Sequence, residues 1–502
     1  MLVAAITTDA SHLNPAITTA GGVHTVAALL FNGLVSLDEA ANPTPELASR
    51  WTIEEGGARY RFTLRPGVRW HDGRPFTSAD VKFTFDSLLL RFHARTRASL
   101  GAAIKAIETP DDSTVLFQFR EPYAILLQQL DVVEAPILPR HLFANSDPTT
   151  NPATQRPVGT GPYRFVSHEP DAEVRLEANA DYFKGPPAIK QVVMRVIPDA
   201  GAQVLALETG EVDWLFGVPG PDRLRLAADS GVRLVQTTVN PGGSNCVNTL
   251  VFNLQRPILM DVRVRRAVAH ALDRVPFVER IEFGGARAAE TPISSRIAVA
   301  RSPGLTFPAH DTLAAARLLD RAGWRRSGDG LRAAQGVRGI DNGTPLRFGF
   351  THMPPLRSYG ELLRSQLRVV GIDLVLLPLE PATFADAVFK ERAFDTGIVS
   401  YCNGTDPEIG VRRMYVSSNI APIPFSNGAA YSDPEMDRLW DAERATLDVA
   451  ARRRIFADIQ RLALRDLPYL SLIETAATRA HRTRCSGFRL GAHFAATARC
   501  GP

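Results

Sequence analysis

The chain has 502 residues, of which 45% are hydrophobic and 22% are charged, and its formal net charge at pH 7 is +4. These values are typical of a globular protein, and the length predicts two or three domains. The small net charge, with no run of lysine or arginine and no stripe of basic and aromatic residues, argues against nucleic-acid binding. No stretch of 18 or more apolar residues occurs, so the sequence predicts no membrane-spanning helix.

The first residues, from Met1 to Asn14, run directly into sequence typical of a folded domain. They lack the basic segment and the apolar stretch of a secretory signal peptide. We therefore expect either that a signal peptide has been removed or that the start of the chain was assigned too late.

The first half of the chain predicts mainly strands. Tyr60, Phe62 and Leu64 alternate with polar residues, as in a half-buried strand. Thr77 and Asp80 have the spacing of a capping box, and apolar residues follow them at helical spacing. Residues 145–157 are rich in Pro, Asn, Thr and Ser and predict a loop. Further elements are expected as strands at 2–6, 115–119, 163–165, 174–176, 192–197 and 212–214, and as a helix at 202–207 that ends before Gly210.

From Thr249 onward, predicted strands and helices alternate. Strands are expected at 250–254, 346–350 and 372–377, and helices after Asp261, at 311–322 and at 360–369. This order predicts an α/β lobe. Pro434 is expected at the first position of a long helical region that continues to Leu462.

The sequence therefore favours two α/β lobes and one inserted subdomain. The expected ranges are 1–41, 157–245 and 470–502 for a discontinuous first lobe, 42–156 for an inserted β-rich subdomain, and 246–469 for the second lobe. A cleft between two such lobes is a common place to bury a small ligand.

Motifs for catalysis, metals and cofactors are missing. No G-x-S-x-G elbow, P-loop, HExxH or complete GxGxxG occurs, and the eleven histidines are scattered without ligand spacing. We expect no catalytic residue, no preformed metal site and no cofactor, and therefore no enzyme. Two alternatives stay open: a hydrolase of small conjugates, and a chaperone-like module that binds extended peptides.

The segment from Trp70 to Val81, WHDGRPFTSADV, resembles the signature of the peptide/nickel/opine family of ABC-transporter solute-binding proteins. Pro157–Phe165, Tyr182–Pro186 and the pairing of Asn253 with Asp261–Arg265 resemble three further segments of that family, in the expected order over about 400 residues. The resemblance implies an α/β fold, that of a two-lobed periplasmic binding protein with an additional β-rich subdomain (type II, cluster C-like).

The resemblance also implies a binding and transport role without chemistry. We expect a monomer in the periplasm, or otherwise outside the cytoplasm, that is associated with the membrane through its transporter. It would close by a hinge on a small-molecule or peptide ligand and deliver it to the ABC permease complex. A peptide or peptide-like solute is the favoured ligand, and an opine, a sugar conjugate, an oligosaccharide or chelated nickel remain alternatives.

Ser400–Pro407 resembles the family's ligand-binding loop, in which an aspartate meets the ammonium group of the ligand, and Asp406 matches that aspartate. The alternative is that Asp406 only shapes an Asp-Pro turn. Arg357 lies closer to its helix than the family arginine that binds the ligand carboxylate, which disfavours a dipeptide with a free carboxylate. The candidate ligand-binding residues are Tyr401, Asn403, Gly404, Thr405, Asp406 and Arg357.

The four cysteines contain no CxxC pair. In an exported protein they can form disulfides with three possible pairings, whereas in a cytosolic protein they would be buried thiols. Some peptide-binding relatives join the position of Cys402 to a strand near the start of the second lobe, and Cys246 lies close to the matching position. The resemblance therefore suggests Cys246–Cys402, with Cys485–Cys500 as the remaining pair.

Overall fold

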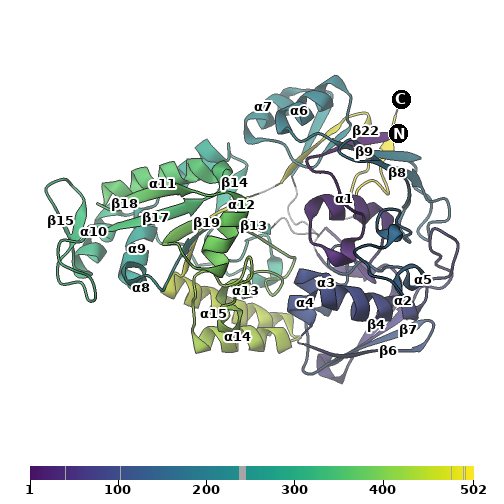
Figure 1. The fold of residues 1–502 in the computed structure, drawn as a ribbon, viewed down its shortest axis with the longest axis horizontal. Coiled ribbons are helices and arrows are strands. Elements are labelled where there is room, and N and C mark those ends of the chain that lie inside the picture. Colours follow the sequence, from purple (N-terminus) through teal and green to yellow (C-terminus); the bar gives the residue numbers. More distant parts are fainter. Residues whose placement is uncertain are drawn as a thin grey trace. The chain divides into compact units, whose positions relative to one another are not determined.

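The computed structural model describes residues 1–39, 41–101, 103–236, 245–475, 477–489, 491 and 493–501. Contacts within the chain divide it into two compact units. Unit 1 comprises Met1–Ser244, Arg444–Leu447 and Ala477–Pro502, and unit 2 comprises Asn245–Glu443 and Asp448–Ala476. Each unit combines strands with helices (Figure 1), which confirms the predicted α/β class.

Unit 1 is built on a seven-stranded sheet with the order β12-β21-β11-β1-β10-β9-β8. The buried strand β1 (Leu2–Ile6) pairs in parallel with β10 (Gln191–Val196) and β11 (Trp214–Leu215). The other strands are β8 (Tyr163–Glu169), β9 (Glu173–Ala178), β12 (Val232–Gln236) and β21 (Thr478–Arg482). The helix α6 (Ala200–Thr209) packs on this sheet through buried Val204 and Leu207, and it ends at Gly210, whose φ of 84° is left-handed, as predicted.

A second sheet of unit 1 has the order β4-β5-β7-β6. The alternation of Tyr60, Phe62 and Leu64 is confirmed, because these three side chains are buried in β5 while their neighbours are half-buried. The strands are β4 (Ala48–Glu54), β5 (Arg59–Leu64), β6 (Ile104–Asp111) and β7 (Thr114–Phe119). This sheet lies in the range 42–156, and since its contacts group it with unit 1, a separate inserted subdomain stays a prediction.

The predicted capping box is present at the start of α2 (Ser78–Phe83). The Asp80 carboxylate accepts hydrogen bonds from the backbone N–H of Thr77 and of Arg140, both at 2.9 Å, and from Trp70 Nε1 at 3.4 Å. Asp80 therefore joins the signature segment to the helix that follows it and to the start of α5 (Arg140–Phe143).

We expect Asp80→Ala to lower the free energy of unfolding by about 1–3 kcal/mol, because it leaves these donors without their acceptor. Asp86→Ala is a matched control in the next turn, since Asp86 forms a half-exposed ion pair with Lys82, and its replacement should cost less than about 1 kcal/mol. Urea denaturation followed by circular dichroism measures both. Equal losses for the two variants would contradict this assignment.

Unit 2 is built on a six-stranded sheet with the order β14-β20-β13-β19-β17-β18. Its members are β13 (Asn245–Phe252), β14 (Ala286–Ala288), β17 (Arg347–His352), β18 (Asp373–Pro378), β19 (Thr396–Asn403) and β20 (Tyr469–Thr475). The pairing of β20 with β13 corrects one predicted boundary. The return to the first lobe was expected at residue 470, but β20 belongs to the sheet of unit 2, and the C-terminal segment of unit 1 begins at Ala477.

The long helical region expected from Pro434 is two helices, α14 (Pro434–Ala445) and α15 (Val449–Asp466). It is interrupted because the Asp448 side chain accepts a hydrogen bond from Ala451 N and caps a new helix there. The two helices pack against each other through Trp440 and Phe456, whose ring centres lie 6.2 Å apart, and Figure 1 shows them side by side.

The helices expected after Asp261, at 311–322 and at 360–369 are present with small shifts of their ends. Asp261 and Asp311 each cap the helix predicted after them. The helices not yet given are α1 (Gly21–Leu30), α3 (Leu90–Phe92), α4 (Ala94–Leu100), α7 (Arg223–Ala228), α8 (Pro257–Met260), α9 (Val262–Ala271), α10 (Thr312–Arg321), α11 (Arg357–Val369), α12 (Pro381–Ala385) and α13 (Arg412–Tyr415). Short strand pairs are formed by β2 (Val35–Leu37) with β3 (Pro43–Pro45), β15 (Trp324–Arg326) with β16 (Arg332–Ala334), and β22 (Cys485–Ser486) with β23 (Arg499–Cys500).

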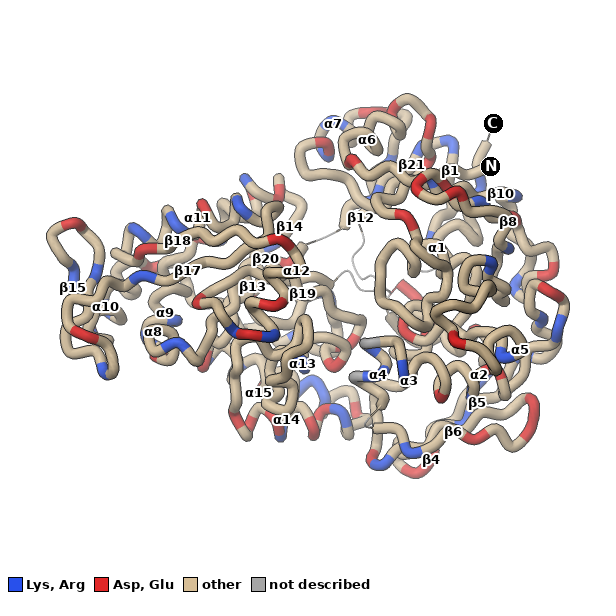
Figure 2. Tube along the Cα trace, viewed as in Figure 1, with Lys and Arg blue, Asp and Glu red and all other residues tan. Residues whose placement is uncertain are grey.

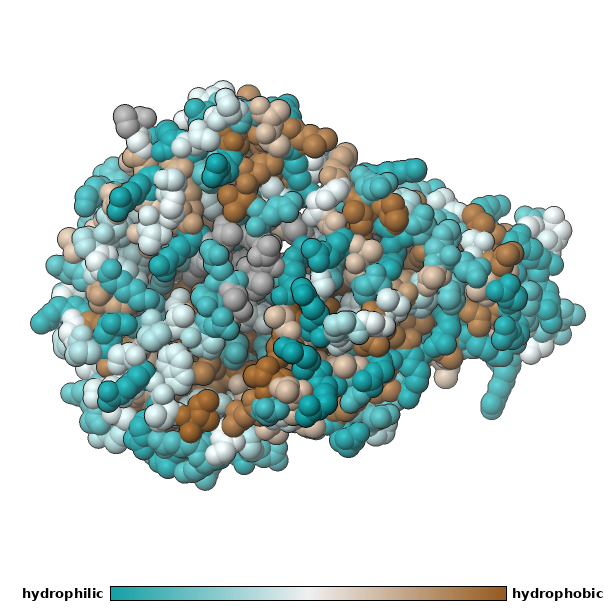
Figure 3. All heavy atoms as spheres, turned by 180° about the vertical axis from the view of Figure 1, so that it is seen from behind, coloured by the Kyte–Doolittle hydropathy of each residue, from teal (hydrophilic) through white to brown (hydrophobic). Residues whose placement is uncertain are grey.

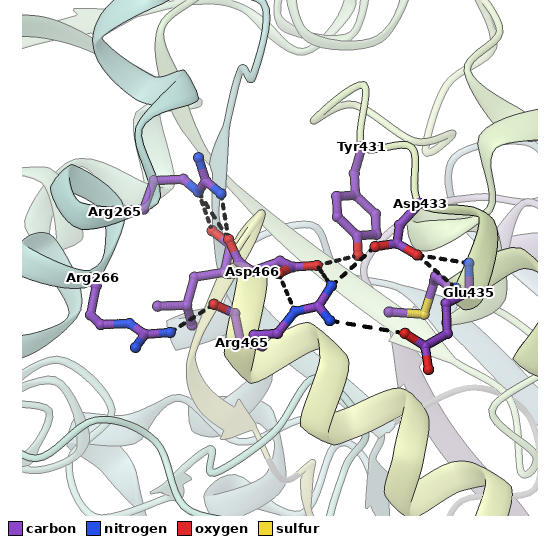
Figure 4. Close-up of polar contacts among 9 residues, drawn as sticks. Arg265, Arg266, Tyr431, Asp433, Glu435, Arg465 and Asp466 are labelled. Carbon is purple, nitrogen blue, oxygen red and sulfur yellow. Dashed lines mark hydrogen bonds and ion pairs between the residues drawn. The ribbon is translucent and has the colours of Figure 1, made fainter.

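A buried arginine joins the ends of two helices in unit 2. Arg265 on α9 donates to the carbonyl oxygens of Leu259 and Met260 at 2.6 and 2.9 Å. It also donates to those of Asp466 and Leu467 at 3.1 and 3.0 Å, and Figure 4 shows Arg265 directed toward Asp466. These carbonyls close α8 and α15, and helix-end carbonyls have no partner within their own helix. Burial lowers the pKa of Arg265 to about 10, so the group remains cationic at neutral pH.

The surface of both units mixes charges and isolated apolar side chains. Figure 2 shows Lys and Arg interspersed with Asp and Glu along each unit. In Figure 3, hydrophobic residues appear at several places among hydrophilic ones on the face drawn there, whereas the end of unit 2 that carries β15 is mainly hydrophilic. Scattered apolar residues of this kind are normal for a folded surface and do not mark a docking face.

Candidate functional site

The loop of residues 404–410 leaves the sheet of unit 2 at a position that commonly binds ligands. Strands β17, β18 and β19 are parallel, so their carboxyl ends lie at one edge of the sheet. The chain passes from β17 to β18 on one side and then to β19 on the other side of β17. Ligands of α/β sheets often bind outside the carboxyl ends of strands where the strand order reverses in this way. This topology supports the 404–410 loop as the candidate site.

Asp406, the predicted counter-charge for a ligand ammonium group, already has a cationic partner. Its carboxylate oxygens lie 2.9 and 3.1 Å from Arg452 Nη2 on α15. One of them also accepts a hydrogen bond from the backbone N–H of Glu408 at 3.1 Å. Since only 2% of Asp406 is exposed, the structure places this carboxylate inside unit 2.

Arg452 lies between two carboxylates. Its Nε donates to Glu443 Oε1 at 2.9 Å, and its Nη2 also contacts Glu443. Burial, followed by the nearby negative charge of Asp406, raises the pKa of Glu443 well above its usual value, which favours a proton on that side chain. Asp406, Arg452 and Glu443, the 406–443–452 triad below, therefore hold the loop against α14 and α15.

A second ion pair stands beside the triad. Arg412 Nε lies 3.6 Å from Glu408 Oε1, and Arg412 Nη2 donates to Asp441 on α14 at 2.8 Å. Glu408 is buried, whereas the Asp441 side chain is largely exposed. Both carboxylates of the loop, Asp406 and Glu408, are therefore buried and paired with arginine.

The other candidates in the loop are mostly enclosed. Tyr401, Asn403 and Thr405 are buried, and Gly404 is half-buried. The Asn403 amide nitrogen and oxygen are both buried without a hydrogen-bond partner among the described residues. Gly410, with a φ of 126°, passes so close that a Cβ there would lie 2.5 Å from Asn403 Oδ1, which explains the glycine.

Arg357 is placed as an exposed residue at the first position of α11. Its side chain is 75% exposed, and its Nε lies 3.5 Å from Glu361 Oε1 one turn further along the same helix. This geometry matches an ordinary helix-surface ion pair. Among the described residues, the polar contact of Arg357 is thus with its own helix and not with the 404–410 loop.

Two features near the loop were not found from the sequence. Arg452 lies 46 residues from Asp406, and nothing in the sequence pattern pairs them. Arg413 places its guanidinium carbon 6.0 Å from the Tyr401 ring centre and 5.6 Å from that of Phe425. Phe425 is 44% exposed and has a φ of 62°, a conformation that only a fixed loop holds for a bulky residue.

Both disulfides that the resemblance suggested are present. Cys246 and Cys402 are directly paired residues of β13 and β19, with Cα atoms 3.9 Å apart, and they close a separation of 156 residues. Cys485 and Cys500 join β22 to β23 across a separation of 15 residues. The first bridge fixes the strand from which the 404–410 loop leaves.

We expect replacement of Cys246 and Cys402 together by alanine to lower the free energy of unfolding by about 2–4 kcal/mol, because the unfolded chain regains the freedom of a long loop. The Cys485→Ala, Cys500→Ala variant is the matched control and should lose less, since its loop is shorter. Urea midpoints with and without reductant measure both. A larger loss for the short loop would contradict this expectation.

Comparison with known proteins identifies the family of this chain. A model of "Bacterial extracellular solute-binding proteins, family 5 Middle" matches residues 42–422. The chain belongs to this family. It is 29% identical to Protein XP55 of Streptomyces lividans, over 88% of the chain and 78% of that protein, and 25% identical to the oligopeptide-binding protein AppA of Bacillus subtilis, over 88% and 80%.

The fold is also that of solved structures. NikA from Brucella suis in complex with Fe(III)-EDTA has a TM-score of 0.85 and 23% identity, covering 99% of this chain and 98% of that one. This likeness confirms the predicted fold, that of a type II periplasmic binding protein. The family consists of extracytoplasmic ligand-binding components of ABC importers, not enzymes, and its members work with permease partners. In the described part of the chain, no helix is both long and apolar enough to cross a bilayer.

Proposed function

We propose that this protein binds a peptide or peptide-like solute outside the cytoplasm and delivers it, as a monomer, to an ABC permease complex. The name of the relative AppA supports a peptide as the solute. The alternatives are an opine, a sugar conjugate, an oligosaccharide or a chelated metal such as nickel, and the Fe(III)-EDTA complex of the structural neighbour NikA is an example of the last class.

The 404–410 loop is the observation that carries this proposal. It leaves the carboxyl edge of a parallel strand, its two carboxylates are held by arginines, and a disulfide fixes its strand. A loop held in this way loses little conformational freedom when a solute binds, which favours affinity. We propose that Tyr401, Asn403, Gly404, Thr405 and Asp406 shape the solute-binding surface, with Arg357 at its margin.

Delivery would follow from closure of two lobes. We propose a first lobe built from 1–41, 157–245 and the C-terminal segment, an inserted subdomain at 42–156, and a second lobe that corresponds to unit 2. A solute that contacts both lobes favours the closed form, and a change from 1:99 to 99:1 requires about 5.5 kcal/mol of differential binding.

Native mass spectrometry of the purified protein tests the class of solute. We expect one bound molecule per chain with the mass and fragmentation of a peptide or peptide derivative. Capture of a sugar, an opine or a metal chelate in its place would overturn the peptide assignment and leave the family unchanged. Conversion of the solute during incubation would support the hydrolase alternative, and weak binding of peptides irrespective of length would support a chaperone-like module.

A further inference from the structure

We propose that this protein recognises a solute without forming an ion pair between an ammonium group and the 404–410 loop, so that its ligand is a peptide-like molecule with a blocked or missing amino terminus. The inference deepens the proposed function and rests on it for the class of solute. It depends on the state of the two loop carboxylates, Asp406 and Glu408, which the structure defines by contacts inside unit 2.

Asp406 has little capacity left for a second cation. Arg452 Nη2 lies 2.9 and 3.1 Å from its two oxygens, and the backbone N–H of Glu408 donates a hydrogen bond to one of them. The side chain is also buried. An incoming ammonium group would have to displace Arg452. The guanidinium would then lose one of its two partners in a buried site, and broken buried ion pairs are among the costliest changes a protein can make.

Glu408 is not an alternative partner for a ligand ammonium group. It is buried with Arg412, whose guanidinium also bonds to Asp441. The residues that follow the loop and are partly exposed are Arg412 and Arg413, and the exposed carboxylate nearest to them, Asp441, is already paired with Arg412. A cation nearby disfavours a ligand ammonium group and acts against free amines at this surface.

Neutral polar groups remain at the base of the loop. The side-chain amide of Asn403 and the side-chain oxygen Oδ1 of Asn245 are buried without hydrogen-bond partners among the described residues, while Asn245 Nδ2 donates to Gly404 O at 3.0 Å. Buried amides without partners are uncommon, and they match the donors and acceptors of another amide. Asn403 and Asn245 are 1% and 0% exposed, so this end of β13 and β19 supplies buried neutral groups and no further anionic partner for an ammonium ion.

Carboxyl labelling of the whole chain tests how accessible the Asp406 carboxylate is, and it requires no ligand. A carbodiimide with methylamine modifies accessible carboxylates, and peptide mass spectrometry gives the rate at each site. We expect Asp406 to be modified at least tenfold more slowly than Asp441, which is 62% exposed and serves as the control. Equal rates at the two sites would overturn the inference, whatever the solute is.

Calorimetry with paired probes tests the class of ligand. A mixed tripeptide library and the same library after N-acetylation are titrated against the protein. We expect acetylation to change the affinity by less than threefold or to increase it. A loss greater than tenfold would overturn the inference. If neither library binds, the peptide assignment under the proposed function fails, and the labelling rates still decide the state of Asp406.

Discussion

Arg452→Met is expected to lower the free energy of unfolding of this protein by about 3–5 kcal/mol, because it removes the cation that pairs with the buried Asp406 carboxylate and donates to buried Glu443. Asp406 would lose its partner at 2.9 Å, and Glu443 would lose a donor at 2.9 Å. Methionine keeps much of the volume of the arginine stem, so the loss reports charge rather than a cavity. Urea unfolding monitored by tryptophan fluorescence and by circular dichroism measures it.

Arg453→Met is the matched control, since Arg453 is exposed on the same helix and should change the stability by less than about 0.5 kcal/mol. The double variant Asp406→Asn, Arg452→Met completes a double-mutant cycle. The stability losses of its two single variants should not add in it, because the two side chains are in direct contact. Additive losses, or an Arg452→Met variant as stable as the control, would show that the 406–443–452 triad does not hold the loop.

Arg265→Met is expected to cost at least about 3 kcal/mol, because four helix-end carbonyl oxygens lose their donor together. The contacts run from 2.6 to 3.1 Å and join α8 and α15 to α9, and Figure 4 shows those with the end of α15. Hydrogen exchange should also become faster in the last turn of α15. Thermal and urea unfolding give the size of the loss, and mass spectrometry after exchange gives its position.

Arg266→Met is the control for this substitution. Arg266 is the next residue on α9, and its Nη2 donates at 2.7 Å to the exposed carbonyl oxygen of Arg465, which water can satisfy in its absence. We expect a loss below about 1 kcal/mol. Similar losses for Arg265→Met and Arg266→Met would mean that the buried carbonyl contacts of Arg265 contribute little to stability.

Local patterns in the sequence predicted the elements well. The alternation in β5, the capping box at Thr77 and Asp80, and the helix caps at Asp261 and Asp311 all depend on residues close together in the chain. Such signals act over one or two turns and are readable without tertiary contacts. The break after α14 could also have been read, since Asp448 precedes the second helix as an N-cap.

Pairings between segments far apart in the chain could not be predicted from the sequence. The assignment of β20 to unit 2 follows from its ladder with β13, more than 200 residues earlier, and no local pattern encodes that partner. The state of Asp406 depends in the same way on Arg452 and Glu443. The matching loop residues therefore indicated where to look, whereas the availability of the carboxylate could be judged only from the folded contacts.

The central claim is that one solute is held and released unaltered by a protein that closes around it. Small-angle scattering tests this claim most directly. The monomer is measured with and without a saturating amount of the solute found by native mass spectrometry, and the mass of the recovered solute is determined afterwards. The account predicts a smaller radius of gyration in the bound sample and a solute of unchanged mass. An identical radius at full occupancy, or a solute converted to product, would contradict it.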